Sequence, residues 1–380
     1  LVTDKGVALN MGGIALDVRR GSNPRELAFM LDVPRWKLGD RPEVRATKSR
    51  IAGTIARFAD EAGNPSFETA VVNVEAGIEP IPTELLDGLA NQGGLLVDAL
   101  GERVNFSASA QNLSLSGGTL RASASSPNAN ATVQGRMVNG VFVVDPSSNA
   151  TVSRVTSDLT DRFRAAIPIV SRFEKSEHDE ALRVTLDSPV TVPIDGTFDA
   201  LNGDLTLDLG TASFATSDMF SKVLRVVQQR DAGQVGKRMP AIKFHMRDGV
   251  VTFDRYPLPL GEFTVHTEGV INLSSRRVKI RSGSDRDAKN FLEPGHMEVL
   301  TVVPAGAVAL ESLDVLGSGL LNLPGRVVPG LNTLTNVPFR TRGPIADPKT
   351  DVAVDLIGSQ LINNISRPDK LFENIGGGLK

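Results

Sequence analysis

The sequence predicts a mainly β protein, built as a long, curved, antiparallel-rich sheet that forms an open groove, with a few short amphipathic helices. Apolar and polar residues alternate with period two along most of the chain. Turn-forming residues separate the alternating runs. Most runs are apolar on one side only, which is typical of antiparallel sheets, whereas doubly wound parallel sheets have continuous apolar strands.

The alternating runs and the turns between them indicate the order of the strands. Asn139-Gly140 lies between two apolar runs and is the strongest short hairpin signal in the chain. Gly117-Gly118 is expected to join two further strands, and Ser274-Ser275 to end another. Clear runs include Val7–Met11, Ile14–Val18, Val104–Ala108, Leu182–Leu186 and Leu205–Leu209.

Amphipathic segments with apolar residues at helical spacing interrupt the strands. Ser217 is a good N-cap for one of them. They divide the chain into an N-terminal β-groove segment, 1–180, with two helices, and a C-terminal region, 181–380, with three. The expected helices cover 83–100, 157–173, 217–233, 311–322 and 357–375.

Glycine replaces one side chain in the apolar row of five expected strands. Glycine within a strand marks a bend, a bulge or a close approach, so we expect these positions to let a broad sheet curl. The competing explanation is chance, because the chain has 36 glycines. Their nearly equal spacing toward the C-terminus suggests a weak internal repeat. The positions are Gly53, Gly135, Gly196, Gly269 and Gly343.

Composition and motifs narrow the classes of function. The chain has no cysteine, which excludes disulfides, thiolate zinc sites and cysteine nucleophiles. With 41 basic and 44 acidic residues it has no basic footprint for nucleic acid. Its four histidines lack metal-ligand spacing, and no nucleophile elbow or phosphate loop is present. We therefore expect no enzymatic activity, no metal and no cofactor; an enzyme of unrecognised type remains an alternative.

The closing segment resembles the C-terminal signature of the AsmA-like family. That signature is an apolar strand, a Gly-x-Ile/Leu-x-Asp-Pro turn and a second strand. The resemblance extends over 190–358, and Pro344 stands where the family often has threonine. The matching residues are Val337-Pro338-Phe339, then Gly343-Pro344-Ile345-Ala346-Asp347-Pro348-Lys349, then Val352-Ala353-Val354-Asp355-Leu356.

The resemblance implies a function as well as a fold. AsmA- and TamB-type proteins are anchored in the bacterial inner membrane and project across the periplasm. Their apolar grooves are thought to carry phospholipids between membranes, as in bridge-like lipid transfer proteins. The resemblance thus implies a periplasmic location, a tether outside this sequence, a part in outer-membrane biogenesis, and phospholipid and envelope proteins as partners. Because the sequence opens at Leu1 with a strand-like pattern, we expect it to be part of a longer chain.

Ten apolar residues on the expected strands are the candidate lining of the groove. Alternation alone does not separate an open lipid groove from a closed core, because both need one apolar face. The alternative function is therefore a structural or adhesive surface module with a closed core and no lipid. The candidate residues are Leu205, Leu207, Leu209, Phe263, Val265, Ile271, Val337, Phe339, Val352 and Val354.

Overall fold

The computed structural model divides the chain into two compact units. Unit 1 comprises Leu1–Leu159, Ala181–Gly196 and Gly203–Leu205, and unit 2 comprises Thr160–Glu180, Thr197–Asn202 and Thr206–Lys380. The predicted mainly β, antiparallel class is confirmed. The structure describes residues 9–21, 25–38, 43–59, 69–89, 93–155, 170–175, 179–216, 234–260, 263–281, 288–304, 336–345, 347–353 and 356.

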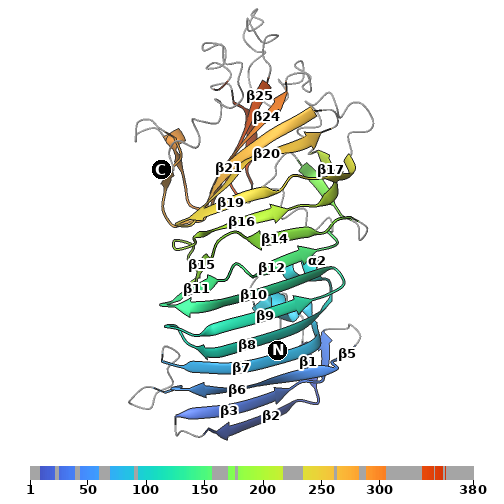
Figure 1. Ribbon diagram of the computed structural model, residues 1–380, viewed down its shortest axis with the longest axis vertical. Helices are drawn as coiled ribbons and strands as arrows, with labels where there is room; N and C mark the ends of the chain where they lie inside the picture. The colour runs from blue at the N-terminus through green and yellow to red at the C-terminus, as the bar shows by residue number, and fades with distance from the viewer. Residues whose placement is uncertain are drawn as a thin grey trace, which may run out of the picture. The chain divides into compact units, whose positions relative to one another are not determined.

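Unit 1 is an antiparallel sheet whose neighbouring strands follow one another along the chain (Figure 1). The two halves of its strand Ala129–Val138 pair with two different strands, so the sheet continues as two branches. The order is β2 (Ala15–Arg20), β3 (Glu26–Asp32), β6 (Lys48–Ala56), β7 (Val71–Pro82), β8 (Arg103–Leu113), β9 (Thr119–Ser125) and β10 (Ala129–Val138), then β11 (Val141–Val144) with β15 (Val190–Pro193), and β12 (Asn149–Val152) with β14 (Leu182–Leu186).

This sheet is open rather than closed into a barrel. Within the part of the chain that the structure describes, β2 pairs with β3 and with no second strand. The predicted hairpin between β10 and β11 is confirmed. Asn139 and Gly140 form its turn with φ of 49° and 80°, the left-handed conformation that Asn-Gly adopts readily.

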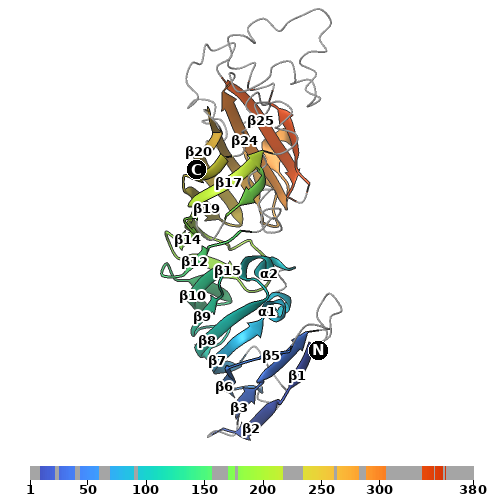
Figure 2. The ribbon, with the colours of Figure 1, turned by 90° about the vertical axis from the view of Figure 1, so that its right-hand side faces the viewer.

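A small second layer covers one end of one sheet face (Figure 2). It consists of α1 (Thr83–Leu89), α2 (Leu95–Leu100) and a three-stranded sheet, β1 (Leu9–Gly12), β4 (Arg35–Leu38) and β5 (Val44–Arg45). Trp36 from the layer and Ile78, Ile81 and Val104 from the sheet form a buried cluster with Leu100. This core fixes the layer on that end of the face.

The single helix predicted over 83–100 is wrong, because two short helices occupy this range. Gly93 and Gly94, just before α2, have φ of 60° and 98°, and these positive values turn the chain between the two helices. The Asp87 carboxylate accepts hydrogen bonds from the N–H groups of Gly94 and Leu96, at 2.5 and 2.7 Å. The aspartate therefore caps the start of α2 from the end of α1.

None of the other predicted helices is present within the described residues. Residues 170–173, the end of the helix expected over 157–173, belong to a strand, β13 (Val170–Glu174). The rest of that range and the helices expected over 217–233, 311–322 and 357–375 lie outside the described residues. No helix in the described part of the chain is long and apolar enough to span a bilayer.

Unit 2 is built on six antiparallel strands. Its order is β19 (Ile242–Arg247), β20 (Val250–Leu260), β21 (Phe263–Asn272), β24 (His296–Pro304), β25 (Asn336–Pro344) and β26 (Lys349–Val352). The remaining elements are β16 (Gly203–Asp208), which begins in unit 1, the sheet of β13 with β17 (Thr211–Thr216) and β18 (Gln234–Arg238), and the β22 (Val278–Lys279) and β23 (Phe291–Leu292) pair with η1 (Ala288–Asn290).

Candidate functional site

One face of the unit 1 sheet, here called the apolar face, carries almost only apolar side chains. Directly paired residues share a face, so the strand registers define rows of side chains that cross the sheet. One row runs from Val18 through Phe29, Gly53, Val74, Ala110 and Leu120 to Gly135. The next runs from Leu16 through Leu31, Ile51, Ala76, Ala108 and Ala122 to Val133.

The covering layer leaves part of the apolar face accessible. Val133 is 39% exposed, Leu16 64% and Val18 55%. Phe29 and Val74 of the first row are half-buried, whereas Ala110 of that row is buried, and Leu31 and Ile51 of the second row pack against the buried cluster. Single exposed apolar residues are ordinary on protein surfaces, whereas contiguous rows of them mark a binding surface. The accessible part of the apolar face is therefore the candidate site.

Two of the predicted glycines shape this face. A Cβ added at Gly53 would overlap the carbonyl oxygen of Asn73, and one added at Gly135 would overlap that of Val143. Each glycine thus allows the neighbouring strand to come closer than any side chain would permit. Both positions are close approaches between neighbouring strands, and the expectation that they let the sheet curl stays a prediction.

The other three predicted glycines differ from one another. Gly196 lies in a bend after β15, with φ of 81°, and not in a strand as expected. Gly269 lies under the ring of Phe253, whose nearest carbon would be 2.5 Å from an added Cβ. Gly343 is next to the last residue of β25, with φ of 139°. The sequence pattern around the three glycines is the same, but their backbone conformations and surroundings differ.

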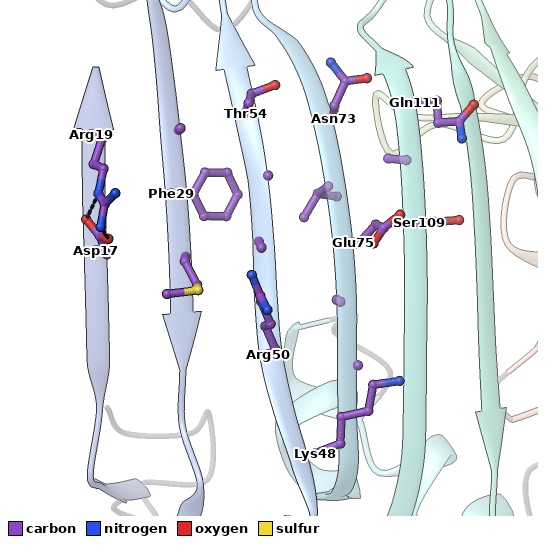
Figure 3. Close-up of a pocket in the computed structure, with 18 residues that line it drawn as sticks. Asp17, Arg19, Phe29, Lys48, Arg50, Thr54, Asn73, Glu75, Ser109 and Gln111 are labelled. Atoms are coloured by element: carbon purple, nitrogen blue, oxygen red, sulfur yellow. Dashed lines mark hydrogen bonds and ion pairs between the residues drawn. The ribbon is translucent and has the colours of Figure 1, made fainter. Parts of the chain in front are cut away.

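The opposite face of the unit 1 sheet is polar and hollowed. A concavity of about 910 Å³ lies over β2, β3, β6, β7 and β8, and Figure 3 shows the side chains that line it. Arg19 pairs with Asp17, and the hydrogen bond raises the pKa of the Arg19 guanidinium above its ordinary value. Lys48 pairs with Glu79 at 3.7 Å. This face is suited to water, so the sheet is amphipathic across its thickness.

The candidate lining residues of the sequence analysis lie mostly inside unit 2. Val265, Val337 and Phe339 are 0% exposed. Leu209 and Val352 are 4% and 5% exposed. Leu205, Leu207, Phe263 and Ile271 are half-buried, and Val354 lies outside the described residues. Register brings Val265 and Phe339 onto one face of the unit 2 strands, while the exposed apolar residues Leu16, Val18 and Val133 are in unit 1. A role for these ten residues in contacting lipid stays a prediction.

Apart from Gly53 and Gly135, sequence reasoning did not select the residues of the apolar face as a site. The alternation of Leu16 with Val18 was visible and correctly indicates a strand. The family resemblance, however, covers only 190–358, so the ten candidate lining residues were chosen from that range, most of which belongs to unit 2. Exposure was the missing information, because alternation gives the face of a residue and not what covers it.

Unit 2 holds a buried group of charges on the sheet face opposite Val265. Glu298 has a side chain that is 1% exposed and pairs with three arginines. Arg281 contacts its Oε1 atom directly, while the Nε atoms of Arg340 and Arg342 lie 3.7 and 3.5 Å from its carboxylate oxygens. The Arg342 guanidinium also donates to the carbonyl oxygens of Lys289 and Phe291. The cluster ties η1 and β23 to β24 and β25.

Burial also changes two ionisable groups of β21. It raises the pKa of the Glu268 carboxyl to about 8, against the smaller opposing effect of the Arg255 charge. It lowers the pKa of the His266 imidazole, and Arg255 adds to that shift. Neither residue belongs to a metal site, since no group of three His, Asp or Glu side chains in the described residues could hold an ion.

No family model, curated protein or solved structure matches this chain.

Proposed function

We propose that the chain binds the acyl chains of phospholipids on the apolar face of unit 1 and conducts them between membranes of a cell envelope. The observation that carries the proposal is the continuity of the apolar rows from β2 to β10 beside side chains as exposed as Leu16 and Val18. The resemblance to AsmA-like proteins supports the same cargo, a periplasmic location and a membrane tether outside this sequence.

The energetics favour an apolar ligand of this kind. Each CH₂ group moved from water to an apolar surface contributes about 0.8 kcal/mol. The seven strands from β2 to β10 are separated by about 4.8 Å each, so the apolar rows extend for about 29 Å along the sheet. One leaflet of a bilayer has a hydrocarbon depth of about 15 Å. An acyl chain therefore fits along a row with length to spare.

Such a function requires no catalytic group. The apolar rows offer aliphatic side chains and one phenylalanine, which suit a fluid chain and fix no orientation for chemistry. A polar opposite face keeps the sheet in water while its apolar face holds the ligand. We therefore propose a non-enzymatic conduit, whose partners beside phospholipid are other envelope proteins.

One observation favours the second candidate, a structural or adhesive module with a closed core. In unit 2, Val265, Val299 and Phe339 share one sheet face and are each 0% exposed. A face buried to that degree resembles an ordinary core rather than a lipid track. The two candidates therefore make opposite claims about unit 1, where Leu16, Val18 and Val133 of the apolar rows are exposed.

The test measures lipid bound to the purified 380-residue chain. Lipid that co-purifies is extracted and identified by mass spectrometry, and the uptake of a fluorescent phospholipid from vesicles is followed. The variant Leu16→Asp/Val133→Asp places charges on the apolar face. The matched control, Ala15→Asp/Thr132→Asp, changes the preceding residues of the same strands, which face the other side.

We expect the wild-type chain and the control variant to take up lipid and the apolar-face variant to lose most uptake. Circular dichroism should show the same strand content in all three. If the folded wild-type chain neither retains nor takes up lipid, the conduit proposal fails and the closed-core module is the better description. Equal uptake by both variants would exclude the apolar face as the site.

A further inference from the structure

The outer strand of the unit 1 sheet, β2, carries apolar side chains that are not covered. Leu16 and Val18 lie in the apolar rows, yet they are the two most exposed large apolar residues among those that the structure describes. Leu31 and Phe29, their partners in β3, are half-buried. A neighbouring strand would cover the next place in each row, so this exposure is that of an edge strand. Among the described residues, β2 pairs with β3 alone.

The outer edge of β2 also carries backbone hydrogen-bonding groups. The N–H of Gly21, directly after β2, donates to the carbonyl oxygen of Glu26 in β3 at 2.8 Å. In an antiparallel pair the N–H and C=O groups of alternate residues point to opposite sides, and β2 pairs with β3 without a shift in register. The groups of Leu16, Val18 and Arg20 therefore lie on the outer edge.

β2 has few of the features that normally prevent an edge strand from pairing with another chain. These features are proline, a bulge and charged side chains that point into the apolar face. β2 has no proline, and its register is regular. The charged residues in its middle, Asp17 and Arg19, belong to the polar face, and Arg20, the charge on the apolar face, is the last residue of the strand.

The charges on the polar face make β2 complementary to itself. Figure 3 shows Asp17 and Arg19 side by side on this strand, with the Arg19 Nε donating to the Asp17 Oδ1 at 3.0 Å. If two β2 strands pair antiparallel around Val18, Asp17 of each copy lies opposite Arg19 of the other. Centring on Asp17 or on Arg19 puts like charges opposite each other, which is unfavourable. Centring on Leu16 puts Arg19 opposite Gly13, whose φ of 70° is outside the strand conformation.

We propose that two copies of this chain associate through their β2 strands, antiparallel and centred on Val18, into one continuous sheet. Directly paired residues share a face, so the apolar faces lie on the same side and Val18 of one copy meets Val18 of the second copy. Twice the seven strands from β2 to β10, at about 4.8 Å each, give apolar rows of about 60 Å. The dimer stands independently of the proposed lipid cargo.

Single cysteines test the register of the pair, because the chain has no cysteine of its own. In Val18→Cys the two introduced thiols lie on Cα atoms about 5.5 Å apart, which a disulfide spans. In the control, Leu16→Cys, they lie about 13 Å apart along the two strands, which is too far. Leu16 is 64% exposed and Val18 55%, so chance collisions would favour the control.

We expect the 380-residue Val18→Cys chain to form a disulfide-linked dimer at least about tenfold faster than the Leu16→Cys chain, because a complex raises the local thiol concentration. Mild oxidation followed by non-reducing gel electrophoresis measures both rates. Equal rates, or faster linking of Leu16→Cys, would overturn the register and with it the charge pairing that supports the proposal.

Reversal of the charges tests the same pair without cysteine. Asp17→Arg gives β2 two arginines on the polar face, and Arg19→Asp gives it two aspartates. Each variant alone should dimerise at least about tenfold more weakly than the wild type, because like charges then lie opposite each other. An equimolar mixture should recover a heterodimer. The matched controls, Glu75→Arg and Arg121→Asp, lie in the same row as Asp17 but in inner strands, and should dimerise as the wild type does.

Sedimentation velocity over about 1 to 100 μM, where small interfaces dissociate, gives the dimer fraction of each sample. A wild-type chain that is monomeric at every concentration would overturn the proposal, as would a mixture that fails to recover the dimer. Loss of the dimer in the two controls would also overturn it, because the effect would not depend on the edge. Lipid is absent from all these samples, so their outcome leaves the proposed function to its own test.

Discussion

Gly53 of β6 and Asn73 of β7 are so close that a Cβ atom on the glycine would overlap the carbonyl oxygen of the asparagine and lie 2.9 Å from the Cα atom of Val74. The contact is between a strand and the backbone of its neighbour, so no rotamer change relieves it. The approach of β6 to β7 in the middle of the apolar face depends on this one missing side chain.

We expect Gly53→Ala to lower the free energy of unfolding of unit 1 by about 1 to 3 kcal/mol, the usual cost of an overpacked position. The chain's single tryptophan, Trp36, is buried in the unit 1 core and reports on that unit in a urea titration. Gly117→Ala is the control, because an added Cβ there meets nothing within 4 Å. Equal stability of the two variants would contradict the close approach.

Asp87→Ala should destabilise the covering layer. The substitution leaves the N–H groups of Gly94 and Leu96 without the carboxylate that now accepts from both. Loss of a cap of this kind costs about 1 to 2 kcal/mol. The Trp36 emission in urea measures it, and Asp87→Asn, which keeps one acceptor oxygen, should lose less. A fully stable Asp87→Ala variant would show that the cap does not hold α2.

Glu298→Gln should be one of the most damaging single substitutions in unit 2. It leaves the buried ends of Arg281, Arg340 and Arg342 without their shared carboxylate. Removing one partner of a buried ion pair costs about 3 to 5 kcal/mol. Thermal denaturation followed by circular dichroism gives the loss. The double variant Glu298→Leu/Arg281→Leu should recover part of it, and no recovery would argue against a direct pair.

Glu268 should make the stability of unit 2 depend on pH. Its pKa is about 8 in the folded chain against an ordinary value of 4.5, so the folded state holds a proton that the unfolded state has lost. Stability therefore falls as the pH rises from about 4.5 to 8 and is constant above that range. Glu268→Gln should remove this slope.

The size of the Glu268 effect is limited by solvent. The carboxyl is not wholly buried, so we expect the variant to be more stable than the wild type by about 2 kcal/mol at pH 8.5 and equal to it near pH 4. Urea titrations at both pH values measure the difference. The His266 pKa is lowered, so below about pH 6.5 the unfolded chain binds a proton at this imidazole more readily than the folded chain does. The resulting loss of stability is the same in the wild type and in the variant. A constant difference at all pH values would contradict the buried neutral carboxyl.

Val265→Ala and Val18→Ala should have unequal effects although both remove two methyl groups. Val265 is 0% exposed and Val18 is 55% exposed. The buried deletion leaves a cavity and should cost about 2 to 3 kcal/mol, whereas the exposed one should change stability by less than about 0.5 kcal/mol. Thermal denaturation of the two variants tests this. Similar losses would mean that Val18 is covered in solution.

The alternation of residues was enough to predict the fold class and the hairpin at Asn139-Gly140, because a period of two and a turn dipeptide are local properties. It was not enough to predict that α1 and α2 are separate helices, because apolar residues at helical spacing continue on both sides of Gly93 and Gly94. Nor could it separate Val265 from Val18. Both occupy apolar rows, and only tertiary packing decides which one is covered.

Among the residues that the structure describes, β2 is paired on one side only, and this gives unit 1 a property that barrels lack. A barrel's interior is fixed once its strand number and stagger are set. In this open sheet each further strand would add about 4.8 Å of apolar width and leave the existing rows unchanged. The extent of the apolar face across the strands is therefore set by the number of hairpins in the chain. Duplication of hairpins could lengthen the face without changing the residues already in it.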